Sequence, residues 1–244
     1  MKQMLSFGLW MSGVFERFIE GLSRPFVSAI IPAYNEEQTI KKVIDVIRKS
    51  DVDEIIVVND GSSDRTAEIA KKEGARVISH KKNAGKGAAM KTGVGNAKGN
   101  IIVFLDADLK SLTPKGVNML IFPVKRNEAD FVKSYYSHYK SKTGTSFFLY
   151  RPLLRQLFQG ADFTHPVSGQ ICGRRSFFDR IEFRDDYGID ISILIDALRH
   201  KLKIKEICLG KLAHRNRNTK QVERIADEVI LAILEKADTL RKSR

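Results

Sequence analysis

Cysteine is scarce in this sequence of 244 residues, where only Cys172 and Cys208 occur. The two lie far apart along the chain and match no metal-ligand spacing. Because disulfides accumulate in oxidising compartments, two isolated cysteines predict free buried thiols in a reducing environment. We therefore expect a cytoplasmic protein.

Long apolar runs are also absent. No stretch of about 18 or more uncharged apolar residues occurs, so the sequence predicts no membrane-spanning helix. In residues 1–25, apolar side chains are spaced loosely as in an amphipathic helix, but Glu16, Arg17 and Glu20 interrupt them. The segment lacks the pattern of a secretory signal. Two interpretations stay open: a helix packed on the body or on a second subunit of a homodimer, or a peripheral anchor at the inner membrane face with Trp10 at the boundary.

Acidic residues are fewer than basic ones. The sequence has 29 aspartates and glutamates against 42 lysines and arginines, which gives a formal net charge of +13. Such a chain attracts anions, which include nucleic acid, anionic membranes and phosphorylated small molecules. The aromatic residues are not interleaved with the basic ones in any nucleic-acid-binding motif. We therefore expect phosphorylated partners and no nucleic acid.

The order of elements predicts a single α/β domain over residues 26–244. Strand and helix patterns alternate from residue 26, and the strands are β-branched and apolar throughout. This favours a Rossmann-like, mainly parallel sheet flanked by helices. The strands are expected at 26–31, 54–58, 75–79 and 101–105, and the helices at 36–50, 64–74 and 85–99.

The second half of the domain is more irregular. After about residue 129 the alternation of strands and helices loosens. A strand is expected at 130–136, a helix at 146–158, a strand leading into a short helix at 168–178, a helix at 190–200, a strand at 203–209 and a C-terminal helix at 219–240.

Two carboxylates, Asp106 and Asp108, follow directly on the apolar strand 101–105. A buried carboxylate is costly unless a positive charge compensates it, so the pair indicates either a solvated, capped strand end or a cation site. In parallel sheets, ligands bind beyond the carboxyl ends of the strands. A D-x-D pair there can hold Mg²⁺ or Mn²⁺ against a diphosphate, and Lys86 would add a point charge.

The other strand-end loops have a plain and a functional interpretation. In "NDGSSDRT", Asp60 either forms a turn before a helix cap or accepts an N–H from the edge of a base. In "NAGKG", Lys86 is either solvated on a glycine-rich turn or faces a phosphate. The loop is neither a Walker A motif nor G-x-G-x-x-G after a first strand.

Four motifs in order, "VSAIIPAYNEEQTI", "IIVVNDGSSDRT", "NAGKGAAMKTG" and "IIVFLDADL", resemble the GT-A fold glycosyltransferases of family 2 over residues 26–109. The resemblance implies metal-dependent transfer of a hexose from a UDP-sugar, with residues 26–109 as the nucleotide-sugar half. It further implies that the donor is bound by Pro32, Ala33, Tyr34, Glu36, Asp60, Gly85, Lys86, Asp106 and Ala107.

The second half is similar to members of this family that transfer glucose from UDP-glucose to 3-phosphoglycerate. The similarity is carried by "RPLL", "HPVSGQICGRRSFF", "DYGIDISILID" and "AHRNRN". It implies an acceptor half at residues 110–218 and a C-terminal helix at 219–244. Asp190 would hold sugar hydroxyls or act as base on the acceptor, in a catalytic set with Asp108 and Lys86. The implied metal ligands are Asp106, Asp108 and His214, and the implied acceptor contacts are Thr145, Ser146, Ser168, Gly169, Arg215, Asn216 and Arg217.

The identity of the acceptor stays open because of one departure from those relatives. Ahead of "RPLL" the chain has "KTGTSFFLY" and lacks the arginine that grips phosphoglycerate in those relatives. A polyprenyl or dolichyl phosphate is the alternative acceptor, because a basic chain with an apolar N-terminus suits a membrane surface. Family members that use such lipids often carry spanning helices. A nucleotidylyltransferase is disfavoured, because "PAYNEE" replaces its glycine-rich first loop.

Overall fold

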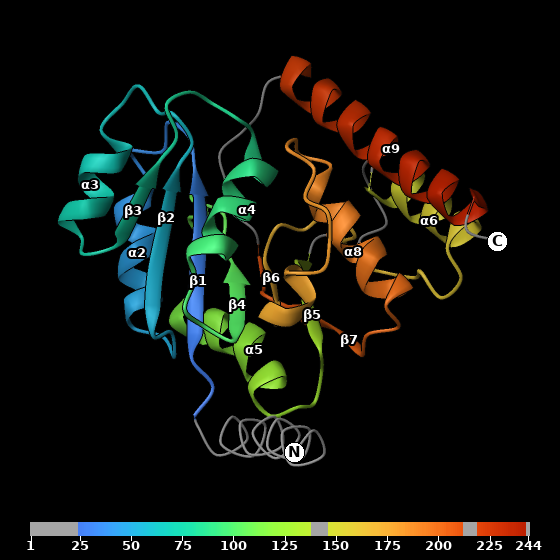
Figure 1. Ribbon diagram of the computed structural model, residues 1–244, viewed down its shortest axis with the longest axis horizontal. Helices are drawn as coiled ribbons and strands as arrows, with labels where there is room; N and C mark the ends of the chain where they lie inside the picture. Colours follow the sequence, from blue (N-terminus) through green and yellow to red (C-terminus); the bar gives the residue numbers. More distant parts are fainter. Residues whose placement is uncertain (1–23, 138–145, 212–218, 243–244) are drawn as a thin grey trace, which may run out of the picture.

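The computed structural model describes residues 24–137, 146–211 and 219–242 (Figure 1). Seven strands form one sheet in the order β3-β2-β1-β4-β6-β5-β7. The strands are β1 (Val27–Ala33), β2 (Glu54–Asn59), β3 (Arg76–Ser79), β4 (Ile101–Phe104), β5 (Phe131–Tyr135), β6 (Ile171–Arg174) and β7 (Ile204–Cys208). The helices are α2 (Ile40–Arg48), α3 (Thr66–Lys72), α4 (Lys86–Asn96), α5 (Pro114–Lys125), η2 (Ser146–Tyr150), α6 (Arg151–Leu157), α7 (Arg175–Phe178), α8 (Ile189–Arg199) and α9 (Thr219–Lys242).

The sheet is mostly parallel, which confirms the predicted α/β architecture. Strands β3, β2, β1 and β4 run parallel, and their arrowheads point to the same edge in Figure 1. Strand β6 is antiparallel to both of its neighbours, β4 and β5, while β7 is parallel to β5. The carboxyl ends of the first four strands therefore meet at one edge, where a ligand site is expected.

Helices cover both faces of the sheet because the strands inside it bury side chains on both sides. In β1, Ala29 and Ile31 pack in a core with α2 and α5, whereas Ile30 packs in a second core with α4 and α8. This alternation follows from the two-residue period of a strand. Figure 1 shows α9 running beside α8, and Val229 and Ile233 of α9 complete the second core.

The sequence analysis assigned no element to residues 110–129, where the structure has α5. The helix begins with Pro114 in its first turn, and the Thr113 side chain caps it by accepting from the Gly116 N–H at 3.1 Å. Pro123 lies inside the helix. Because proline removes a helical N–H and normally disrupts a helix interior, it hid the helical pattern.

Other expected elements occur with shifted ends. The helix expected at 36–50 begins at Ile40, and the one expected at 146–158 divides into the π-helix η2 and α6. Cys172 is a buried free thiol and Cys208 a half-buried one. None of the helices in the described ranges is both long and apolar enough to cross a membrane. The N-terminal segment 1–23 lies outside those ranges.

Candidate active site

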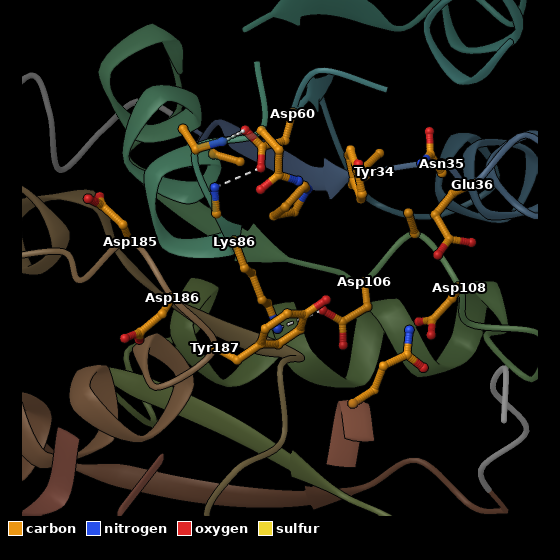
Figure 2. Close-up of a pocket in the computed structure, with 18 of the residues that line it drawn as sticks. Tyr34, Asn35, Glu36, Asp60, Lys86, Asp106, Asp108, Asp185, Asp186 and Tyr187 are labelled. Carbon is orange, nitrogen blue, oxygen red and sulfur yellow. Dashed lines mark hydrogen bonds and ion pairs between the residues drawn. The ribbon is translucent and has the colours of Figure 1, made fainter. Parts of the chain in front are cut away.

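A cavity of about 990 Å³ opens at the carboxyl ends of β1, β2 and β4. We call it the larger cavity. Its walls come from the loops that follow these strands, from the start of α4, from residues 185–187 and from α9. Figure 2 shows Asp60, Lys86 and Asp185 on these walls. A space of this size is in the range that holds a nucleotide-sized ligand.

The loop after β1 is tied to the loop after β2 by hydrogen bonds. Asn35 adopts a left-handed conformation with φ of 55°, which asparagine tolerates better than most residues. Its N–H donates to Ser62 Oγ at 3.0 Å, and its side-chain oxygen accepts from the Ser63 N–H at 2.9 Å. The neighbouring Tyr34 remains 49% exposed on the cavity wall. These hydrogen bonds therefore hold the loop after β1 in place, with the Tyr34 ring on the cavity wall.

Asp60 is buried, and its carboxylate organises the glycine-rich loop (Figure 2). Its Oδ1 accepts from the Ala84 N–H at 2.9 Å and lies 2.7 Å from His80 Nδ1, and its Oδ2 accepts from the Gly85 N–H at 2.8 Å. Gly85 has φ of 100°, and a side chain there would collide with the Asp185 carbonyl. The loop can thus bring its backbone close to a ligand.

His80 was missed by the sequence analysis. Its Nε2 lies 2.9 Å from Thr92 Oγ1 of α4, so the ring links Asp60 to that helix. An ionised carboxylate only accepts hydrogen bonds, so the proton shared with Asp60 is on Nδ1 of His80. The available signal was a histidine directly after a predicted strand, at the edge where the other motifs meet.

Lys86, the first residue of α4, bridges two carboxylates. Its Nζ lies 2.9 Å from Asp106 Oδ1 and 2.6 Å from Asp190 Oδ2. Burial lowers the pKa of Lys86, but the two carboxylates outweigh burial and hold its pKa well above the ordinary value. For the carboxyl of Asp190 the effect of burial has the opposite sign: burial raises its pKa, and the charge of the Lys86 ammonium opposes that rise. Lys86 is therefore a fixed positive charge.

Asp106 and Asp108 follow β4 and line the larger cavity on the same side (Figure 2). Their oxygens are the donors that Mg²⁺ and Mn²⁺ favour, and such ions complete their shell with phosphate oxygens and water. Within the described part of the chain, no three His, Cys, Asp or Glu side chains group closely enough to hold a metal. His214, the third implied ligand, lies outside that part. The pair fits a cation that is shared with a diphosphate.

A smaller cavity of about 140 Å³ adjoins the larger one and shares Lys86, Asp106 and Asp108 with it. Asp190 lies on its wall and is 5% exposed, and its Oδ1 finds no hydrogen-bond donor among the described residues. A buried carboxylate oxygen of this kind is costly unless a ligand donates to it. The remaining wall includes Tyr136, Tyr150, His165, Ser168 and Gly169.

Lys133 of β5 lies fully buried behind the smaller cavity. Its Nζ donates to the Ser168 carbonyl at 2.7 Å and approaches the Asp190 carbonyl at 3.4 Å. Burial lowers the pKa of Lys133 to about 8. The sequence analysis placed this lysine in a strand and gave it no role, although a charge within an apolar strand was a visible signal.

Residues 185–187 and α9 also line the larger cavity, and sequence reasoning missed them. Asp186 accepts from Arg184 at 2.8 Å, and the Tyr187 N–H donates to Glu228 of α9 at 3.0 Å. The contact to Glu228 joins segments 41 residues apart in sequence, so the motif around residues 186–187 does not reveal it. Gln221 and Arg224 of α9 complete this wall.

Most of the expected site residues come together. The larger cavity is lined by Pro32, Ala33, Tyr34, Glu36, Asp60, Gly85, Lys86, Asp106, Ala107 and Asp108, and the smaller one by Ser168, Gly169 and Asp190. The expected contacts Thr145, His214, Arg215, Asn216 and Arg217, and the side chain of Ser146, lie outside the described residues.

Comparison with known proteins gives a family. The sequence model described as "Glycosyl transferase family 2" matches residues 28–182. Glucosyl-3-phosphoglycerate synthase of Mycobacterium tuberculosis is 32% identical over 234 residues, which cover 85% of this chain and 72% of that protein. The enzyme of the same name from Petrotoga mobilis is 29% identical, over 88% of this chain and 74% of that protein.

Solved structures agree with the sequence matches. The crystal structure of the M. tuberculosis synthase with phosphoglyceric acid superposes with a TM-score of 0.80 and 33% identity, over 88% of this chain and 80% of that one. Its complex with Mn²⁺, UDP and glucosyl-3-phosphoglycerate gives a TM-score of 0.78 and 32% identity over the same shares of the two chains. With this fold and these matches, the chain belongs to glycosyltransferase family 2 and is a nucleotide-sugar-dependent glycosyltransferase of the GT-A fold.

Proposed function

We propose that this enzyme transfers glucose from UDP-glucose to a small phosphorylated acceptor such as 3-phosphoglycerate, with Mg²⁺ or Mn²⁺ at Asp106 and Asp108. The relatives named above support the substrates. Structures of the M. tuberculosis synthase contain Mn²⁺ with UDP-glucose and phosphoglyceric acid, Mg²⁺ with UDP, and Mn²⁺ with UDP-glucose and glycerol 3-phosphate.

The observation that carries the proposal is the position of Lys86 between Asp106 and Asp190, where the two cavities meet. The bond from diphosphate to sugar must lie at such a junction if the nucleotide fills one cavity and the acceptor enters the other. As that bond breaks, negative charge grows on the diphosphate. A fixed ammonium, 11% exposed, stabilises this charge without reorganisation.

The larger cavity suits the UDP moiety. The loop at residues 32–36 offers Tyr34 and backbone groups to the uridine. We assign Asp60 to the uracil edge, in addition to its bond with the Gly85 N–H. The conformation of Gly85 lets the loop approach the diphosphate. A divalent cation at Asp106 and Asp108 neutralises diphosphate charge when it is bound.

Asp190 is assigned to the transferred sugar. Its Oδ2 is held by Lys86, and its buried Oδ1 is left to accept a sugar hydroxyl. This orients the glucosyl group against the smaller cavity. In the alternative role, as base on the acceptor, the same oxygen would take the acceptor's hydroxyl proton.

The acceptor is assigned to the smaller cavity. Its volume of about 140 Å³ suits a compact acceptor, and Ser168 and Gly169 lie on its wall. Lys86 is assigned to the diphosphate, so the acceptor's phosphate needs cations other than Lys86. We assign this role to Arg215 and Arg217, and we assign hydrogen bonds to the phosphate to Asn216, Thr145 and Ser146.

The test is release of UDP from UDP-glucose by the purified full-length chain. With Mn²⁺ and 3-phosphoglycerate, without lipid or detergent, UDP should form, and EDTA should stop the reaction. A parallel reaction supplies polyprenyl phosphate in detergent. Activity on the lipid and none on 3-phosphoglycerate would overturn the acceptor and would favour a membrane role for residues 1–25.

A further inference from the structure

Gln170 lies directly before β6, at the back of the smaller cavity, and is 2% exposed. Its Nε2 donates to Asp106 Oδ2 at 2.5 Å. The other oxygen of the same carboxylate, Oδ1, accepts from Lys86 at 2.9 Å. Each carboxylate oxygen of Asp106 therefore has its own donor.

The amide of Gln170 has one possible orientation. An ionised carboxylate only accepts hydrogen bonds, so the NH₂ group must face Asp106. The amide oxygen then faces three hydroxyls, Tyr136 OH at 2.7 Å, Ser168 Oγ at 3.1 Å and Ser134 Oγ at 3.2 Å. Because the two serine hydroxyls also bond each other, Tyr136 and one serine at a time donate to the amide oxygen.

The backbone beside Gln170 packs closely against Asp106 and Lys86. A Cβ atom at Gly169 would lie 2.6 Å from Asp106 Oδ2 and 2.6 Å from Lys86 Nζ. Real Cβ atoms do not approach so closely, and the glycine lets the chain pass against the ion pair. Lys133 in turn anchors the Ser168 carbonyl at 2.7 Å. The segment 168–170 therefore packs directly against Asp106 and Lys86.

We propose that Gln170 is a positioning residue of the transfer reaction, which fixes Asp106 in the one orientation that serves the cation and the diphosphate. The inference rests on the proposed function, since the cation is assigned to Asp106 there. Groups that hydrogen-bond a metal-binding carboxylate commonly contribute to metal affinity, and their removal costs about 10- to 100-fold.

The test is calorimetric titration of UDP into the purified full-length protein, once with Mn²⁺ and once with EDTA. Gln170→Met keeps the length of the side chain and removes both polar atoms. It should weaken Mn²⁺-dependent UDP binding by about 10- to 100-fold and leave binding in EDTA unchanged. Ser28→Ala is the matched control, because it removes a buried hydroxyl of β1 that bonds Glu54 and should keep wild-type affinity in both buffers.

A purely structural role makes a different prediction. In that case Gln170→Met melts at a lower temperature and binds UDP with Mn²⁺ as the wild type does, or weakens binding equally in both buffers. Either result overturns the inference. Should the wild type itself bind UDP without any gain from Mn²⁺, the proposed cation site fails before Gln170 is tested.

Tyr136→Phe keeps the test decisive if Gln170→Met does not fold. It removes the shortest of the three hydroxyl contacts to the amide oxygen and leaves the amide on Asp106. We expect a loss of Mn²⁺-dependent affinity that is smaller than tenfold and absent in EDTA. Unchanged affinity in Mn²⁺ would contradict the inference.

Discussion

The two cavities that meet at Lys86 are built in different ways. The larger one consists of loops at the ends of parallel strands, held by bonds such as those from the Ala84 and Gly85 N–H groups to Asp60. The smaller one is walled by side chains from distant parts of the chain, and the buried Lys133 and Gln170 support it. The larger cavity is thus shaped by hydrogen-bonded loop backbone, and the smaller one by a buried network of polar side chains.

This difference predicts different responses to mutation. Exposed side chains on the strand-end loops, such as Tyr34, can be lost at little cost in stability, because solvent replaces them. A buried polar network does not, since each deletion leaves a partner unsatisfied in a medium of low polarity. Substitutions around the larger cavity should therefore act on binding and turnover, and those around the smaller cavity on stability as well.

The largest effect on turnover is expected from Asp108→Asn. Asp108 is half-buried at the rim that both cavities share, so its loss should spare the fold. Cation-assisted charge stabilisation contributes several kcal/mol, so the rate of UDP release should fall on the order of a thousandfold. The measurement is steady-state UDP release in Mn²⁺ beside a thermal melt. Near-normal turnover would remove Asp108 from the cation site.

Lys86→Met should damage both cavities at once. It leaves the carboxylates of Asp106 and Asp190 without their shared cation, which typically costs about 3–5 kcal/mol of unfolding free energy. Chemical denaturation measures the loss. The control is Lys91→Met, because Lys91 is exposed on the same helix and should change stability by no more than about 0.5 kcal/mol. Equal losses of unfolding free energy in the two variants would show that Lys86 does not join the two cavities.

Lys133 gives the smaller cavity a pH signature. Its pKa is about 8 in the folded protein against an ordinary 10.5, so the unfolded chain keeps this proton to higher pH. Stability is therefore reduced below pH 8 and recovers as the pH rises toward 10.5, by about 3 kcal/mol in total. The quantity to measure is the unfolding free energy of the wild type minus that of Lys133→Met, across this interval. A flat difference would mean that Lys133 titrates at its ordinary pKa.

His80→Ala should have the smallest effect and should be confined to the larger cavity. It removes one donor from Asp60, and a hydrogen bond to a charged group contributes about 1.5–3 kcal/mol. UDP binding should weaken by at least about tenfold, while the KM for the acceptor stays constant. Thr92→Val, which alters only the far side of the ring, should have less effect. An equal rise in the acceptor KM would show that the cavities are not separable in this way.

The same contrast explains what the sequence could predict. Asp60, Lys86 and Asp106 follow strands within short motifs, so the parallel sheet alone brings them to one edge. Gln170 and Tyr187 lie inside the quoted motifs "HPVSGQICGRRSFF" and "DYGIDISILID". Their places in the site depend on the antiparallel pairing of β6 and on the contact of Tyr187 with Glu228 of α9, which no local pattern encodes. Helix α5 was not predicted because Pro123 lies inside it. The free-energy cost of that proline in a helix is outweighed by burial of Val117, Leu120 and Ile121 against the sheet.

Lys86 and Asp190 should act as one unit on the bond between the two cavities. A double-mutant cycle with Lys86→Met, Asp190→Asn and their combination tests it, with the rate of UDP release from UDP-glucose in Mn²⁺ as the readout. Residues that act as a unit are not additive, so the double variant should be little slower than the slower single variant. If the two losses instead multiply, Lys86 and Asp190 contribute independently, and the claim that one ion pair joins the two cavities is wrong.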